Sequence, residues 1–207
     1  RLLQDINTAI LKGDTQETAQ MIELGLKNNL SSQEIVDNAI IPISKRIAEK
    51  FRGSDFFIPE VVSSLRPIKT GLAVIKRLSP QVPKYEHKIV IATVAGDIHD
   101  IGKNLVALFL QTNGYEVIDL GVDVPEEQII QAVEEHKPAV LALSALLTTT
   151  MGEMANVIEA LEKNRLRRSL KVIVGGGPVT ESFAEFIGAD GYSPHAPSSV
   201  DLVKSLI

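Results

Sequence analysis

The chain has 207 residues, with 44% hydrophobic residues, 23% charged residues and a formal net charge of −5. This length suits one large domain or two small ones, and this composition excludes a chain that is disordered throughout. No face gathers enough Lys and Arg for nucleic acid, and the one basic cluster, Arg165, Arg167 and Arg168, is interpreted as a solvated helix end. The absence of cysteine excludes zinc–thiolate and iron–sulfur sites, and no apolar stretch approaches the roughly 20 residues that a bilayer requires, so we expect a cytoplasmic protein.

The first 79 residues have the apolar spacing of helices. Asp14 with Glu17 and Ser31 with Glu34 resemble capping boxes, and Pro42 is expected to kink or restart the helix in which it lies. Expected helices cover about 2–12, 14–28, 31–51 and 59–78, with a loop at 52–55. Short loops between four helices favour a small antiparallel bundle, which we assign as a domain over residues 1–79. Two prolines and no apolar periodicity make 80–87 a linker.

From Lys88 onward, apolar β-branched runs alternate with amphipathic helical patterns. Expected strands cover 88–94, 115–120, 138–144, 171–175 and 189–192, and expected helices cover 102–113, 125–136, 151–163, 180–187 and 197–206. Five such strand–helix units predict an α/β domain over 88–207 with a doubly wound, flavodoxin-like (Rossmann-like) parallel sheet in the order 2-1-3-4-5.

Ligands of such a sheet bind beyond the carboxyl ends of the strands, where the loops after strands 1 and 3 face each other. The first of these loops lies in "AGDIHDIGKN", Ala95 to Asn104. It resembles a phosphate-binding loop, but five residues separate Gly96 from Gly102, and Asn104 stands where Ser or Thr would bind magnesium.

The unusual residues of this loop are Asp97 and His99. A lone loop histidine is commonly a solvated surface residue. A carboxylate two residues before it, however, can accept a hydrogen bond from one imidazole nitrogen and leave the other free for a metal. Thr150 or Ser144, across the crevice, can bond the carboxylate in turn. No further ligands are evident, and a single histidine suits a metal whose other positions are already filled, as in a macrocycle.

Three glycines, Gly175 to Gly177, follow the fourth strand. They have two interpretations, a tight turn into the next helix or a backbone that a flat or bulky ligand approaches closely, and we favour the second.

Together, Asp97-x-His99-x-x-Gly102, then Ser144-x-Leu146, then Gly175-Gly176 resemble the three-part signature of cobalamin-binding domains. These domains occur in methionine synthase and in the corrinoid proteins of methyltransferase systems. The resemblance covers nearly the whole chain, because this family also places a four-helix cap before its Rossmann-like half.

The resemblance implies cobalamin bound "base-off, His-on", with His99 on cobalt in place of the cofactor's own base. Asp97 would orient His99, and Thr150 would replace the serine that usually completes this relay. Residues implied to contact the cofactor are Gly96, Asp97, Ile98, His99, Asp100, Ile101, Gly102, Ser144, Leu146, Thr148, Thr150, Gly175, Gly176 and Ala196. Gly177 departs from the pattern, since a slightly larger residue is common there. In "FFIPEVV", Phe57 is implied to cover the upper face of the corrin, with Val61 and Leu65 on the same helical face; the alternative for Phe57 is a bundle-core residue.

The implied function is a methyl carrier that is not catalytic alone. Its cobalamin would accept a methyl group from methanol, a methylamine, a betaine or an aryl methyl ether through one methyltransferase. A second methyltransferase would pass the group to tetrahydrofolate or coenzyme M, and a reductive activase would be a further partner. Alternatives are the cobalamin-binding subunit of an adenosylcobalamin mutase, a cobalamin-sensing regulatory module, and, without the resemblance, a response-regulator-like or nucleotide-binding domain. The sequence names neither donor nor acceptor.

Overall fold

The computed structural model describes residues 1–52, 57–79, 85 and 87–207. Some predictions lie outside the described residues: those for 53–55 of the expected loop, for Phe56 and for most of the expected linker. The chain divides into two compact units, one comprising Arg1–Glu86 with Gln111–Gly114, and the other comprising His87–Leu110 with Tyr115–Ile207. The predicted domain limits are close to this division, except that Gln111–Gly114 groups with the first unit.

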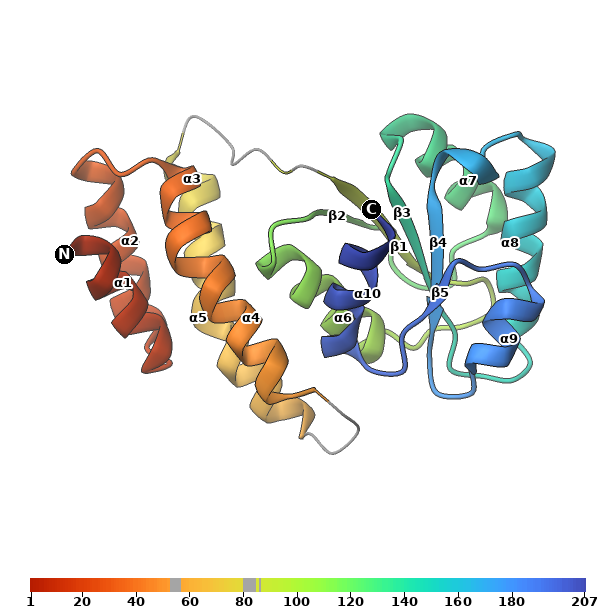
Figure 1. Ribbon diagram of the computed structural model, residues 1–207, viewed down its shortest axis with the longest axis horizontal. Helices are drawn as coiled ribbons and strands as arrows, with labels where there is room; N and C mark the ends of the chain where they lie inside the picture. Colours follow the sequence, from red (N-terminus) through yellow and green to blue (C-terminus); the bar gives the residue numbers. More distant parts are fainter. Residues whose placement is uncertain (53–56, 80–84, 86) are drawn as a thin grey trace. The chain divides into compact units, whose positions relative to one another are not determined.

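The first unit is helical in its described residues (Figure 1). Its elements are α1 (Leu2–Leu11), α2 (Thr15–Lys27), α3 (Ser32–Ile35), a π-helix (Val36–Ile40), α4 (Ile41–Lys50) and α5 (Ile58–Leu78). Its core consists of side chains that are at most 1% exposed, chiefly aliphatic ones from α1, α2, α5 and the segment around the π-helix: Ile6, Ile22, Ile35, Ile40, Leu65, Ile68 and Ile75.

Local sequence signals explain where these helices begin. Ser31 and Glu34 form a complete capping box, whereas Asp14 accepts from the Glu17 N–H at 2.8 Å. Pro42 lies in the first turn of α4, directly after the π-helix. Because proline has no N–H, it cannot continue the regular α-helical ladder, and the wider π-turn accommodates the break. The predicted restart at Pro42 is therefore confirmed.

The second unit contains a five-stranded, all-parallel sheet in the order β2-β1-β3-β4-β5, as predicted. The strands are β1 (Lys88–Thr93), β2 (Glu116–Asp119), β3 (Val140–Ser144), β4 (Lys171–Gly175) and β5 (Gly191–Tyr192). The helices are α6 (Ile101–Thr112), α7 (Glu126–His136), α8 (Met151–Lys163), α9 (Glu181–Phe186) and α10 (Ser199–Leu206), with short 3₁₀ helices at Arg167–Ser169 and Ala196–Ser198.

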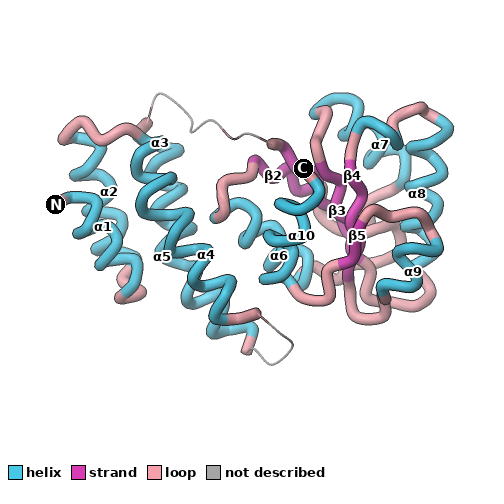
Figure 2. Tube along the Cα trace, viewed as in Figure 1, coloured by secondary structure: helices cyan, strands magenta, loops and turns pink. Residues whose placement is uncertain are grey.

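The sheet is covered on both faces, with α6 and α10 on one side and α7, α8 and α9 on the other (Figures 1 and 2). The central strands are buried almost throughout, because both faces exclude water. In the register, Thr93 of β1 lies opposite Ser144 of β3, and Ser144 lies opposite Gly175 of β4. The loops that follow these three residues therefore leave the sheet at one carboxyl edge.

One sequence interpretation is wrong in part. Arg165 and Arg168 are exposed, but the Arg167 side chain is only 18% exposed, and its Nη2 lies 2.9 Å from Oδ2 of Asp190. Arg167 is thus half of an ion pair, not a solvated helix end. Among the residues that the structure describes, no helix has the length and apolar character needed to cross a membrane.

Candidate functional site

The loop between β1 and α6 is shaped by a local turn at Asp97. Its Oδ1 accepts from the backbone N–H of His99 at 3.1 Å, which is the i to i+2 bond of an Asx turn. The same oxygen lies 2.7 Å from Nδ1 of the His99 ring. The two-residue spacing in the sequence therefore lets one carboxylate oxygen hold both the backbone and the side chain of the histidine.

The other oxygen of Asp97 reaches across to the loop after β3. Its Oδ2 accepts from the N–H groups of Leu146 at 2.8 Å and Leu147 at 3.2 Å, and from the Thr150 hydroxyl at 2.7 Å. The carboxylate is fully buried. Burial by itself would raise the pKa of Asp97, but the hydrogen bonds from Leu146, Thr150 and His99 outweigh it and hold that pKa well below its usual range. Asp97 is therefore an ionised acceptor.

An ionised Asp97 assigns the proton positions on His99. Since the carboxylate can only accept, Nδ1 carries the proton, so in the neutral ring Nε2 is the nitrogen with the free lone pair. The His99 side chain is 45% exposed, so its ring reaches the surface. Among the described residues, no group of three or more His, Cys, Asp or Glu side chains is arranged to hold a metal ion. The site thus offers one oriented nitrogen ligand.

Apolar side chains surround this ligand on both loops. Ile98 is 73% exposed and Ile101 is 62% exposed, on the loop and helix start after β1. Leu146 and Leu147, on the facing loop, are each more than 40% exposed. Clustered exposed aliphatic residues are uncommon on a protein surface and typically mark a binding face. One nitrogen ligand within such a face fits a metal held in a macrocycle, because the macrocycle supplies the remaining ligands and an apolar rim.

Of the two hydroxyls that the sequence offered for Asp97, the structure brings Thr150 into contact. Thr150 precedes α8, and Gly96 lies close to its methyl group. Ser144 is half-buried at the end of β3, where its carbonyl accepts from Val94. Thr148 is exposed on the loop between them.

The glycines have structural roles of their own. A Cβ on Gly176 would overlap the carbonyl oxygen of Ala145, and its φ of +129° lies where side chains are rarely tolerated. A Cβ on Gly175 would lie 2.9 Å from the Ser193 carbonyl oxygen. The loop after β4 therefore packs backbone to backbone against its neighbours in the second unit. Contact of these glycines with a cofactor stays a prediction.

The other predicted residues are placed as follows. Asp100 and Gly102 are exposed beside His99, and Ala196 is buried at the start of a 3₁₀ helix. Phe57 is the N-cap of α5 and is 68% exposed, so it is not a bundle-core residue. Val61 and Leu65 are fully buried in the first unit. These two residues were expected on the same helical face as Phe57; Phe57 instead lies just before the helix and is exposed, whereas they are buried.

Sequence reasoning missed several supporting groups. The N–H groups of Leu146 and Leu147 leave no side-chain signature. Lys103 is 3% exposed, and its Nζ lies 2.6 Å from Oδ2 of Asp119. Asp123 accepts from the N–H of Gly96 at 2.7 Å. Asp119 ends β2, the strand beside β1, and Asp123 follows it. The rule that ligand sites lie at the carboxyl ends of strands was therefore the signal that could have found both aspartates.

Comparisons with known proteins find relatives of both halves of the chain. Residues 87–200 and residues 2–76 each match a family model described as a B12 binding domain. A corrinoid protein of Desulfitobacterium hafniense is 35% identical over 213 residues, covering 100% of this chain and 97% of the relative. The dimethylamine corrinoid protein of Methanosarcina barkeri is 35% identical over 208 residues, with the same coverage of 100% and 97%.

A solved structure supports the same assignment at the level of the fold. The methanol:cobalamin methyltransferase complex MtaBC of Methanosarcina barkeri contains a chain that is 29% identical, with a TM-score of 0.87. The match covers 99% of this chain and 78% of that one. With both halves matched and relatives aligned over their full length, the chain belongs to the family of B12-binding corrinoid proteins of methyltransferase systems.

Proposed function

We propose that this chain is a methyl carrier that binds cobalamin base-off, with Nε2 of His99 as the lower axial ligand of cobalt. The observation that carries the proposal is the pair formed by buried Asp97 and exposed His99, joined at 2.7 Å. Cobalamin, when bound, supplies a cobalt centre that accepts and gives up a methyl group. The full-length similarity to corrinoid proteins, including the helical half, favours a carrier over a mutase subunit or a sensor module.

The protein's own residues would set the properties of the ligand. Asp97 keeps the proton on Nδ1 and directs Nε2 outward, as a carboxylate does when it fixes the tautomer and orientation of a metal-binding histidine. Thr150 and the N–H groups of Leu146 and Leu147 keep Asp97 ionised and fixed. The exposed aliphatic residues would exclude water from the edge of the bound macrocycle. The chemistry asked of this chain is therefore holding and orienting a ligand.

Donor and acceptor belong to this proposal as well. One relative is named for dimethylamine and one similar structure for methanol, so a methylamine or methanol is our first choice of donor. Betaines and aryl methyl ethers complete the proposed donor set, and tetrahydrofolate or coenzyme M is the proposed acceptor. We propose separate donor and acceptor methyltransferases and a reductive activase as partners, with the chain inactive on these donors alone.

Replacing His99 tests the axial ligand directly. The protein is loaded with hydroxocobalamin and reduced to cobalt(II), and the paramagnetic resonance spectrum is recorded. The unmodified protein should show coupling of the cobalt electron to a histidine nitrogen, seen by labelling histidine with ¹⁵N, and His99→Ala should lose it. His136→Ala, at the end of α7, is the matched control and should keep it. A spectrum unchanged in His99→Ala contradicts the assignment.

Phe57 extends the proposal to the upper face of the cofactor. Its ring is 68% exposed, which leaves it available for contact with a ligand. We propose that it shields the reactive face of the corrin. Methylcobalamin bound to Phe57→Ala should therefore be cleaved by light faster than methylcobalamin bound to the unmodified protein. Leu11→Ala removes a 56% exposed side chain of α1 and serves as the control. Equal photolysis rates in all three proteins would remove Phe57 from the site.

A further inference from the structure

The segment between β2 and α7 holds the backbone on both sides of Asp97. Oδ1 of Asp123 accepts from the N–H of Gly96 at 2.7 Å, and the N–H of Asp123 donates to the carbonyl of Asp97 at 2.8 Å. These two bonds engage the peptide group that precedes Gly96 and the peptide group that follows the Asp97 Cα atom. Asp123 is thus the residue of the neighbouring loop that fixes where the Asp97 backbone lies.

The same segment also holds the far end of the histidine loop. Asp119, the last residue of β2, accepts from buried Lys103 of α6 through both carboxylate oxygens, at 2.6 and 2.8 Å. Its Oδ1 also accepts from the N–H of Gly121 at 2.9 Å, which ties the ion pair to the segment itself. The loop that contains His99 is therefore held at both ends. Asp123 bonds to it before Asp97, and Asp119, at the end of β2, bonds to Lys103 after His99.

The backbone of Asp123 has a conformation that few residue types tolerate. Its φ is +51°, in the left-handed region that non-glycine residues other than Asn and Asp seldom occupy. Gly121 in the same segment has a φ of +92°. A side chain that can hydrogen-bond locally is the usual reason for a non-glycine residue to stand in this conformation.

We propose that Asp123 is a positioning residue for the axial ligand, acting on His99 through the backbone of Asp97. The inference rests on the proposed role of His99. Oδ1 of Asp97 holds both the Nδ1 and the backbone N–H of His99, so a shift of the Asp97 backbone turns the ring. Asp123 is exposed and does not need to contact the cofactor for this role.

Two substitutions separate the hydrogen bond from the backbone conformation. Asp123→Asn keeps an acceptor oxygen and a residue that tolerates positive φ, and it removes the charge. Asp123→Gly tolerates the same φ and removes the acceptor. Positioning by the hydrogen bond therefore predicts that Asn behaves like the unmodified protein and Gly does not.

Three measurements are made on the full chain. Hydrogen exchange of the Gly96 amide is followed by NMR in the cofactor-free protein, and hydroxocobalamin affinity is measured by absorbance titration. The fraction of cobalt(II) coupled to ¹⁵N-histidine is read from the paramagnetic resonance spectrum. Asp123→Gly should exchange the Gly96 amide faster, bind about fivefold to tenfold more weakly, as expected for loss of one hydrogen bond, and show a smaller coupled fraction. Asp123→Asn should match the unmodified protein within about twofold, since it retains the acceptor.

The outcomes distinguish this inference from the function on which it rests. If the unmodified protein shows no histidine coupling, the proposed function fails and the inference fails with it. If the unmodified protein shows coupling and Asp123→Gly shows the same affinity and coupled fraction, only the positioning role is overturned, even when the Gly96 amide exchanges faster. Should Asp123→Gly not fold, as judged by circular dichroism, Asp123→Ser takes its place. Its hydroxyl is too short to reproduce the carboxylate contact, and the same criteria apply.

Discussion

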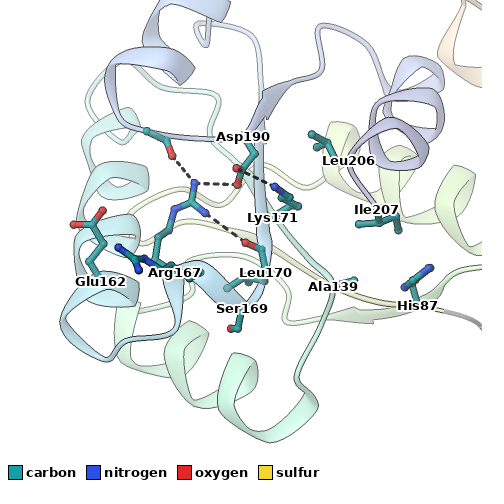
Figure 3. Close-up of a pocket in the computed structure, with 12 residues that line it drawn as sticks. His87, Ala139, Glu162, Arg167, Ser169, Leu170, Lys171, Asp190, Leu206 and Ile207 are labelled. Carbon is teal, nitrogen blue, oxygen red and sulfur yellow. Dashed lines mark hydrogen bonds and ion pairs between the residues drawn. The ribbon is translucent and has the colours of Figure 1, made fainter.

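The two edges of the sheet in the second unit differ in how their polar groups are used. At the carboxyl edge, Asp97 gathers five hydrogen bonds and thereby leaves one atom, Nε2 of His99, directed outward. At the amino edge lies a hollow of about 660 Å³, lined by residues including His87, Ala139, Arg167, Lys171, Asp190 and Ile207 (Figure 3). A hollow of this volume could by itself be taken for a ligand site.

Three charged groups of the amino edge, those of Arg167, Lys171 and Asp190, are directed at one another. Arg167 bonds to Asp190 at 2.9 Å and to the carbonyl oxygens of Gly188 and Leu170 (Figure 3). Asp190 also accepts from the N–H of Val172 at 2.7 Å and lies 3.9 Å from Nζ of Lys171. This network ties the start of β4 to the residue before β5. The comparison teaches that a binding site is recognised by a group left unsatisfied and aimed outward, and that a hollow whose charges are paired serves the fold.

The largest effect on cobalamin affinity should follow from Asp97→Asn, which changes the central hydrogen-bond acceptor of the carboxyl edge. Asparagine replaces one acceptor oxygen by an NH₂ group, which would meet N–H donors on whichever side it lies. Loss of a carboxylate behind a metal ligand typically costs 10–100-fold in affinity, and we expect cobalamin affinity to fall by about that factor. Absorbance titration measures it.

Glu127→Gln is the control for this substitution. It removes the same charge from the start of α7, where the side chain is exposed, and should leave the affinity within about twofold, because no hydrogen bond of the site is lost. Equal losses in the two variants would mean that general electrostatics, and not the Asp97–His99 pair, governs binding.

The ionisation of Asp97 should also make the stability of the folded chain depend on pH in acid. The pKa of Asp97 is lower in the folded chain than the ordinary 3.8, so the unfolded chain binds the proton more tightly. The stability that ionised Asp97 contributes is therefore fully present above about pH 5 and is lost as the pH falls below 3.8 towards the folded pKa. Thermal melting of the cofactor-free protein and of Asp97→Asn should show a constant gap from pH 7 to about 5, which then closes with acid. A gap that widens below pH 4 would contradict the assignment of Asp97 as ionised.

The sequence predicts the part of this architecture that depends on local patterns. Strand order, most element boundaries and the Asp97–His99 pair follow from apolar periodicity and from a spacing that one Asx turn enforces. The sequence offers two hydroxyls of the facing loop, those of Thr150 and Ser144, as hydrogen-bond partners of Asp97. In the structure the Thr150 hydroxyl makes this bond.

What the sequence could not show were contacts made by the backbone and between distant residues. Leu146 and Leu147 bond to Asp97 through their backbone amides, and their apolar side chains give no sign of that contact. Asp123 reads as an ordinary turn residue until its bond to Gly96 is seen. Arg167 stands in a run of arginines, and nothing in that run indicates which of them meets Asp190.

The amino edge provides the strictest test of the comparison. Arg167→Met keeps much of the side-chain volume and removes the guanidinium, so Asp190 loses one of its partners and the carbonyl oxygens of Gly188 and Leu170 lose this donor. Leaving partly buried acceptors unpaired should lower the free energy of unfolding by about 1–3 kcal/mol, measured by urea denaturation. Arg168→Met, on the same 3₁₀ helix but exposed, should change that free energy by less than about 0.5 kcal/mol. Because the Arg167 pair serves the fold and not a ligand, cobalamin affinity should stay within about twofold in both variants under conditions where they are folded. If Arg167→Met bound cobalamin markedly more weakly while remaining as stable as Arg168→Met, the amino edge would have to be counted as part of the site, and the distinction between the two edges would not hold.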